Sequence, residues 1–167
     1  MNTRRMTLRV RSAIIILLVV MLDRVSKLYI RSSYAEWDIT VVIPHIFNIV
    51  HAENPGAAFS MLASAPPIVR AILLVGVSML VMAVVGVMLW RLPKNAGALM
   101  STSLALVFGG AFGNLWDRIF RGSVTDFLQV FIGSYEFPAF NVADSAITIG
   151  AALLIIDLLR THKPATA

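Results

Sequence analysis

Four long apolar stretches constrain this chain of 167 residues more than any other feature of its sequence. A helix needs about 20 mostly apolar residues to cross the hydrocarbon core of a bilayer. Hydrophobic residues make up 58% of the chain, and a domain of this size cannot bury so much apolar surface within itself. We therefore expect a membrane all-α fold, a four-transmembrane-helix bundle with spans at about 12–30, 71–90, 97–116 and 143–159.

The distribution of Lys and Arg predicts the orientation of these spans. Residues 1–11, 91–96 and 160–167 together hold eight such residues, whereas residues 31–66 and 117–140 hold three. Basic residues are enriched in cytoplasmic loops, so we expect both termini in the cytoplasm. The basic N-terminus is similar to a secretory signal, but no small-residue cleavage site follows. We interpret it as the start of a retained first span within one integral membrane domain, residues 1–167.

The connection between the first and second spans is expected to be a small extracytoplasmic β-rich segment, at about residues 38–60. Ile39–Ile43 and Ile46–Val50 are rich in β-branched residues and predict two short strands. Asn54-Pro55-Gly56 predicts a turn, since proline presets φ and glycine accepts positive φ. Phe127–Ile132, in the connection between the third and fourth spans, is a candidate for another strand.

Several polar residues lie within or beside the spans. Asp23 and Lys27 are four residues apart and share a helix face, which fits either a structural ion pair or a functional pair. Gly109 and Gly113 have the spacing that lets helices pack closely. Asn114 and Arg118 lie one turn apart, and the Arg118 guanidinium is suited to bind a carboxylate or a carbonyl oxygen.

Two aspartates, Asp126 and Asp144, are predicted at similar depth on the outer side. Asp144 has a structural interpretation, because Asn141 is a good helix N-cap and an acidic residue three positions later favours the helix dipole. Its functional interpretation depends on the pair. Two carboxylates brought together cannot both ionise cheaply, so one serves as base while the other serves as acid. Water attack on an amide needs that combination.

Other catalytic classes find little support. The chain has no cysteine, which excludes disulfides, thiolate metal sites and a cysteine nucleophile. His45 and His51 do not have the spacing of a zinc site. We therefore expect neither a metal nor another cofactor. The positive charges flank apolar runs instead of forming a patch with aromatic residues, which argues against nucleic acid as a partner.

Five segments of the chain, in order, resemble the bacterial lipoprotein signal peptidases, also called signal peptidase II. Each segment is weakly specific alone, but together they span nearly the whole chain without departures at the motif positions. They are Asp23 with Ser26-Lys27; Asn54-Pro55-Gly56-Ala57-Ala58-Phe59; Gly109-Gly110-Ala111-Phe112-Gly113-Asn114 with Asp117-Arg118; Val124-Thr125-Asp126-Phe127; and Phe140-Asn141-Val142-Ala143-Asp144.

This resemblance implies an aspartic endopeptidase of the bacterial inner membrane, with its active site near the extracytoplasmic face. Its substrates would be prolipoproteins, cut before a cysteine that carries a diacylglyceryl group, and membrane lipid would surround the site. The resemblance also implies a cradle formed by the β-rich segment and inhibition by the cyclic peptide globomycin. It makes Asp126 and Asp144 the catalytic residues, and it makes the following residues dyad-supporting or substrate-binding: Asp23, Lys27, Asn54, Gly56, Asn114, Arg118 and Asn141.

Two other functional classes remain as alternatives. A small proton-coupled transporter would use intramembrane Asp23, Lys27 and Asp144 as an ion path. Such a protein is expected to show inverted repeats and broken helices, and the sequence shows neither. A non-catalytic membrane scaffold would explain the small residues of the third span but would leave the outer aspartates without a role.

Overall fold

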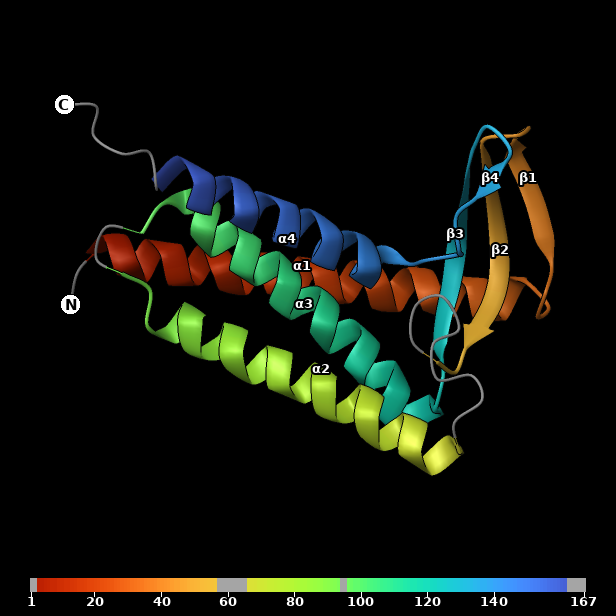
Figure 1. The fold of residues 1–167 in the computed structure, drawn as a ribbon, viewed down its shortest axis with the longest axis horizontal. Helices are drawn as coiled ribbons and strands as arrows, with labels where there is room; N and C mark the ends of the chain where they lie inside the picture. Colours follow the sequence, from red (N-terminus) through yellow and green to blue (C-terminus); the bar gives the residue numbers. More distant parts are fainter. Residues whose placement is uncertain (1–2, 57–65, 94–95, 162–167) are drawn as a thin grey trace.

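In the part of the chain that the structure describes, four helices form the body of the molecule, with a small antiparallel sheet at one end (Figure 1). The computed structural model describes residues 3–56, 66–93 and 96–161. α3 is the central helix, because it packs against each of the other three. The helices are α1 (Thr3–Ser33), α2 (Pro67–Trp90), α3 (Ala98–Arg121) and α4 (Val142–Thr161).

Three of these helices, α2, α3 and α4, are long and apolar enough to cross a membrane. The most apolar window of α2 has a mean hydropathy of 2.8, yet only 6% of it is buried within the molecule. An apolar surface of that extent facing outward fits a lipid environment. α1 has 31 residues, so it is also long enough to span, but polar and charged residues, including Asp23, Arg24 and Lys27, interrupt its apolar character.

The helix ends follow local sequence signals. α2 begins at Pro67 with Pro66 as its N-cap, as expected from residues that lack a backbone N–H donor. α3 ends at Gly122, which adopts φ of 77° and lets its backbone N–H donate to the carbonyl of Arg118. A helix occupies each of the four ranges predicted as spans, and α1 and α3 extend several residues beyond the predicted ends.

The sheet is built from two separate connections. Its strands follow the order β1-β2-β3-β4 and all neighbours are antiparallel. The β-rich segment predicted between the first two helices is only part of this sheet, because half of the strands come from the connection between α3 and α4, where Phe127–Ile132 is the candidate strand. β2 needs a hydrogen-bonding partner along its second edge, and β3 supplies it. The strands are β1 (Ile39–Ile43), β2 (Phe47–Asn54), β3 (Val124–Ile132) and β4 (Tyr135–Glu136).

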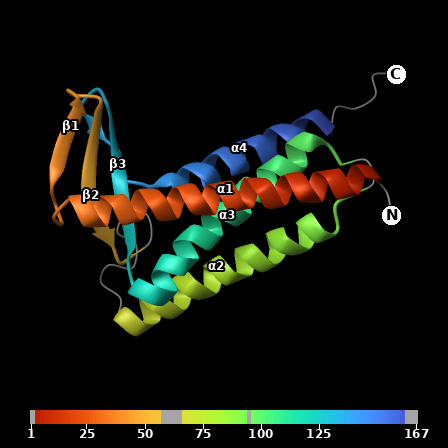
Figure 2. The same cartoon turned by 180° about the vertical axis from the view of Figure 1, so that it is seen from behind.

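The sheet lies at the end of the bundle where α1 ends and α4 begins, and the start of α1 and the end of α4 lie at the other end (Figure 2). β2 and β3 pair so that Asn54 faces Val124 and Ala52 faces Asp126. On a strand pair, diagonal neighbours on one face are within reach of each other. This register therefore places Asn54 beside Asp126.

Glycines on α3 allow α1 and α4 to approach it closely, as their spacing predicts. A Cβ at Gly109 would lie 3.0 Å from the Cβ of Val19 on α1. A Cβ at Gly113 would lie 2.6 Å from Oδ2 of Asp23, and one at Gly110 would overlap the carbonyl oxygen of Ala143 on α4. Larger residues at these positions would push the helices apart and separate the polar side chains between them.

Candidate active site

A cavity of about 650 Å³ lies where α3 and α4 meet the sheet. Both predicted aspartates line it, together with three other predicted site residues, Asn54, Asn114 and Arg118. The rest of its wall is largely apolar. The apolar residues of the wall include Val124, Phe137, Pro138, Ala139, Phe140, Ile147 and Ile149.

Asp126 lies on β3 and accepts two hydrogen bonds from asparagine side chains. Nδ2 of Asn54 donates to Oδ2 at 2.9 Å, and Nδ2 of Asn141 donates to Oδ1 at 2.7 Å. Burial disfavours the ionised carboxylate and raises the pKa of Asp126 to about 7, and the nearby charge of Asp144 acts in the same direction. The two amide hydrogen bonds oppose this shift only in part.

Asp144 lies in the first turn of α4 and forms a reciprocal cap with Asn141. The backbone N–H of Asp144 donates to Oδ1 of Asn141 at 2.9 Å, and the backbone N–H of Asn141 donates to Oδ2 of Asp144 at 3.2 Å. The remaining oxygen, Oδ1, accepts from Nδ2 of Asn114 at 2.7 Å. The structural interpretation of Asp144 as a helix cap is thus correct, and the same carboxylate also lines the cavity.

Asn141 joins the two aspartates, which we call the amide-held pair (Asp126 and Asp144). Its side-chain amide binds one carboxylate and its backbone N–H binds the other. Every hydrogen bond recorded to these two carboxylates within the described part of the chain comes from an amide N–H. Amides are neutral donors, so they fix the geometry of the pair without forcing both members to ionise.

Arg118 contributes a positive charge to the wall of this cavity. It lines the cavity with both aspartates and lies close enough for their charges to act on it. Its Nε is buried and has no hydrogen-bond partner among residues 3–56, 66–93 and 96–161. Nε is therefore a donor left for another group, such as the carboxylate or carbonyl oxygen that the sequence suggested as its partner.

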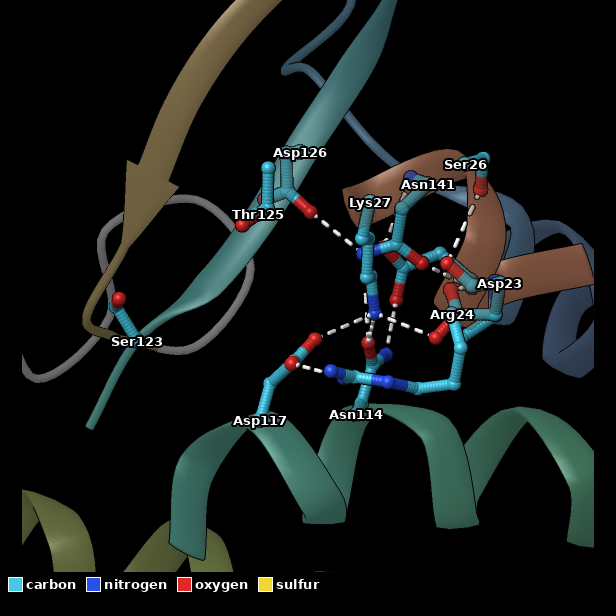
Figure 3. A network of polar contacts seen from close by, with 12 residues as sticks. Asp23, Arg24, Ser26, Lys27, Asn114, Asp117, Ser123, Thr125, Asp126 and Asn141 are labelled. Carbon is cyan, nitrogen blue, oxygen red and sulfur yellow. Dashed lines mark hydrogen bonds and ion pairs between the residues drawn. The ribbon is translucent and has the colours of Figure 1, made fainter. Parts of the chain in front are cut away.

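Asp23 and Lys27 form the ion pair that their spacing predicts, at 2.8 Å between Oδ2 and Nζ. Both side chains are fully buried. Lys27 also donates to Oδ1 of Asn114 at 3.1 Å (Figure 3). This bond leaves Nδ2 of Asn114 as the donor to Asp144. Oδ1 of Asp23 accepts from the backbone N–H of Ala143 at 3.1 Å, so α1 contacts the N-terminus of α4 directly.

The ion pair of Asp23 and Lys27 belongs to a larger group of charged side chains. We call this group the ionic cluster, and its members are Asp23, Arg24, Lys27, Arg31, Glu53 and Asp117. Asp117 forms ion pairs with three cations: Arg24, Lys27 at 2.9 Å and Arg31 at 3.1 Å. Sequence reasoning missed the roles of Asp117, Arg31 and Glu53. One signal for Asp117 was its position three residues after Asn114, which places both on one face of α3.

Glu53 connects this cluster to the start of β3. It accepts hydrogen bonds from Ser123 at 2.5 Å and from Thr125 at 2.7 Å, and Arg31 lies 3.7 Å away. Burial alone would raise the pKa of Glu53, but these hydrogen bonds and the Arg31 charge bring it below the usual range. The hydrogen bond from Thr125 on β3 to Glu53 on β2 thereby helps to fix the strand that carries Asp126.

Gly56 completes the set of predicted residues. Its backbone N–H donates to Oδ1 of Asn54 at 3.0 Å, as in the turn predicted for Asn54-Pro55-Gly56. This bond leaves Nδ2 of Asn54 directed at Asp126. The remainder of that motif, Ala57 to Phe59, lies outside the described residues.

Comparison with known proteins gives consistent relatives for this chain. The family model described as signal peptidase (SPase) II matches residues 15–160. A lipoprotein signal peptidase of Syntrophus aciditrophicus is 43% identical, covering 87% of this chain and 90% of its own, and one of Pseudomonas putida is 44% identical, covering 88% and 85%.

Solved structures of bacterial membrane enzymes share the fold. One is 33% identical with a TM-score of 0.80 and covers 94% of each chain. A second is 34% identical with a TM-score of 0.77 and covers 89% of this chain and 92% of its own. Together with the three long apolar helices, these neighbours identify a multi-pass membrane protein.

Proposed function

This chain belongs to the signal peptidase II family, and we propose that it removes signal peptides from prolipoproteins by aspartic catalysis. The relatives bear the name lipoprotein signal peptidase, which makes the chain a protease and gives no support to a proton-coupled transporter. The observation that carries the aspartic mechanism is the amide-held pair, two carboxylates on one cavity joined by Asn141.

The proposed reaction uses the two aspartates in different protonation states. Asp144 is ionised and takes a proton from a water molecule, whose oxygen attacks the scissile carbonyl carbon. Asp126 is protonated and donates to the carbonyl oxygen, because its pKa of about 7 keeps the proton available near neutral pH. As the tetrahedral intermediate collapses, the C–N bond breaks and the proton held by Asp144 goes to the leaving amine. One hydroxyl of the intermediate returns a proton to Asp126 as its C=O bond reforms, so both aspartates recover their starting forms.

The neighbouring polar groups have positioning roles in this proposal. Asn114 and Asn141 hold Asp144, and Asn54 and Asn141 hold Asp126. Arg118, with donors still free, is placed to stabilise negative charge that develops on the substrate. Lys27 and Asp23 act through Asn114 and the N-terminus of α4. Gly56 acts through Asn54.

The substrate proposed is a prolipoprotein whose cysteine carries a diacylglyceryl group, cut immediately before that cysteine. The apolar wall of the cavity suits a hydrophobic signal segment, and the lipid chains can stay in the bilayer while the peptide bond reaches the aspartates. Globomycin is expected to compete for the same cavity, on the basis of the family resemblance.

We also propose that α1 is a fourth membrane span. Its outward face carries exposed apolar side chains, including Leu17, Leu22 and Val25, while its charged residues Asp23 and Lys27 are fully buried. Four spans place both termini on one side, which the excess of basic residues assigns to the cytoplasm. The sheet and the cavity then lie at the extracytoplasmic face of the inner membrane.

The test is cleavage by the purified full-length protein in detergent. Two forms of one prolipoprotein are compared, with and without the diacylglyceryl group on cysteine, and the products are identified by mass spectrometry. We expect cleavage before the cysteine in the lipid-modified form and little or none in the unmodified form. No cleavage of either form by folded protein would contradict the proposed activity, and equal cleavage of both would contradict lipid recognition.

A further inference from the structure

The segment from Phe137 to Phe140 runs beside β3 and extends the sheet on its cavity side. Phe140 forms an antiparallel bridge with Leu128: its N–H donates to the carbonyl of Leu128 at 3.0 Å, and its carbonyl accepts from the N–H of Leu128 at 2.8 Å. The N–H of Phe137 donates to the carbonyl of Val130 at 2.9 Å. Both residues therefore direct backbone groups toward β3.

Ala139 makes no backbone hydrogen bond to β3, although it lies between two residues that do. Phe137 and Phe140 are three residues apart, so the alternation of a regular strand is interrupted between them. Pro138 before it has no N–H, which is typical of an edge strand. Within the described ranges, no hydrogen bond uses the N–H or C=O of Ala139. Ala139 also lines the cavity that holds Asp126 and Asp144.

A helical peptide cannot use this edge, because its backbone N–H and C=O groups already bond to each other. Hydrolysis of a peptide bond in a signal helix requires the scissile carbonyl to leave that pattern and reach water and the aspartates. In a lipid environment each freed backbone group costs several kcal/mol if it finds no partner. A strand edge beside the aspartates supplies such partners where they are needed.

We propose that the substrate segment around the scissile bond binds in an extended conformation, as an added strand hydrogen-bonded to the N–H and C=O of Ala139. The inference rests on the proposed peptidase function and specifies how that site holds its substrate. It makes recognition partly independent of side chains, because main-chain hydrogen bonds provide the contact. Residues on both sides of the scissile bond are then read at alternate positions.

A scan of backbone-modified substrates tests this placement on the wild-type enzyme. In a set of lipid-modified prolipoprotein peptides, each amide from three residues before to two residues after the scissile bond is replaced in turn by an ester, except the scissile amide itself. An added strand predicts that kcat/KM falls about fivefold at sites of alternating sequence position, with little change between them. A uniform effect, or no effect at any site, would overturn the proposal.

The enzyme itself offers a second measurement. Ala139→Pro removes the N–H donor, and Ala139→Ser keeps it at a similar side-chain volume. We expect Ala139→Pro to raise KM about fivefold with a smaller change in kcat, and Ala139→Ser to keep the alternating pattern of the ester scan. Equal kinetics for the two variants, both folded by thermal unfolding, would contradict a role for the N–H. If Ala139→Pro does not fold, the ester scan decides alone.

The experiments distinguish a failure of the peptidase function from a failure of the added strand. If wild-type enzyme leaves the unmodified lipidated substrate uncut, the peptidase function is wrong. If it cuts that substrate but the ester scan shows no alternation, the peptidase function stands and only the added strand is wrong.

Discussion

The buried and half-buried carboxylates between the helices and the sheet form two neighbouring groups that are held in different ways. Those of the ionic cluster, Asp23, Glu53 and Asp117, bind the three cations Arg24, Lys27 and Arg31. Those of the amide-held pair accept hydrogen bonds from asparagine amides and one backbone N–H. The two groups touch at Asn114, which accepts from Lys27 and donates to Asp144.

The difference indicates which carboxylates can exchange a proton. A neighbouring cation stabilises the ionised form of a carboxylate, so the cluster keeps its charges and serves to hold α1, α3 and the sheet together. An amide hydrogen bond favours the ionised form less than a cation does, so burial and the neighbouring carboxylate can keep a proton on one member of the pair near neutral pH. The cluster therefore fixes geometry, and the pair is suited to acid–base chemistry.

The largest effect is expected from removing either ionisable group of the amide-held pair. Asp126→Asn and Asp144→Asn each keep the side-chain volume but cannot hold or release the proton. We expect kcat to fall by about 10³-fold or more in each, with the double variant no worse than the singles, because the two groups act as a unit. Cleavage of lipid-modified prolipoprotein measures this, and thermal unfolding checks the fold. Substantial activity in either single variant would show that the reaction does not need both carboxyl groups of the amide-held pair.

The next largest effect is on stability, in the ionic cluster. Asp117→Asn leaves Arg24, Lys27 and Arg31 without their shared carboxylate, and breaking a buried charge pair typically costs about 3–5 kcal/mol. We expect a large drop in thermal stability in detergent, with any loss of activity following the loss of folded protein. Glu36→Gln, on an exposed residue, is the matched control and should change little. A stable but inactive Asp117→Asn would instead place Asp117 in the chemistry.

An intermediate effect is expected where the two groups meet. Asn114→Ala removes the donor to Asp144 and leaves Lys27 with one partner fewer. We expect kcat to fall by about 10²-fold, as for other single donors at a reacting group, with a modest loss of stability. Asn48→Ala removes a similar amide bond to Gln129 in the sheet, outside the cavity, and serves as the control. Equal kinetics for the two variants would argue against Asn114 as a positioning residue.

The smallest effect is expected from Asn54→Ala and concerns pH. The Asn54 hydrogen bond lowers the pKa of Asp126, so its loss raises that pKa above about 7. If protonated Asp126 is the acid, activity is lost as pH rises through this value, and the alkaline limb of the kcat profile moves to higher pH in the variant. The shift belongs to the coupled pair and not to one residue alone. A limb that stays in place or moves to lower pH would contradict the assignment.

The sequence predicted the helices well because hydropathy depends only on local composition. It also placed Asp126 and Asp144 near each other and paired Asp23 with Lys27. The first strand, Ile39–Ile43, was predicted with the bounds that are observed. Their functional roles stay predictions, since they came from motif resemblance and await the variants above.

The ionic cluster and the full sheet could not be predicted from local patterns. β2 continues through the polar residues His51 and Glu53, which favour a loop in isolation, because β3 supplies partners 70 or more residues away. The register of that pairing places Asn54 toward Asp126 and Glu53 toward Thr125. Pairing between distant segments sets this arrangement, and no short motif records it.

We expect the amide-held pair to share a proton and the ionic cluster to hold none. Infrared spectroscopy of the detergent-solubilised protein can follow the stretching band of protonated carboxyl groups as pH is varied. We expect a band that disappears as pH rises through about 7. The band should be absent in Asp126→Asn and should persist in Asp117→Asn. A wild-type protein with no protonated carboxyl just below pH 7, or with an identical band in Asp126→Asn, would contradict it.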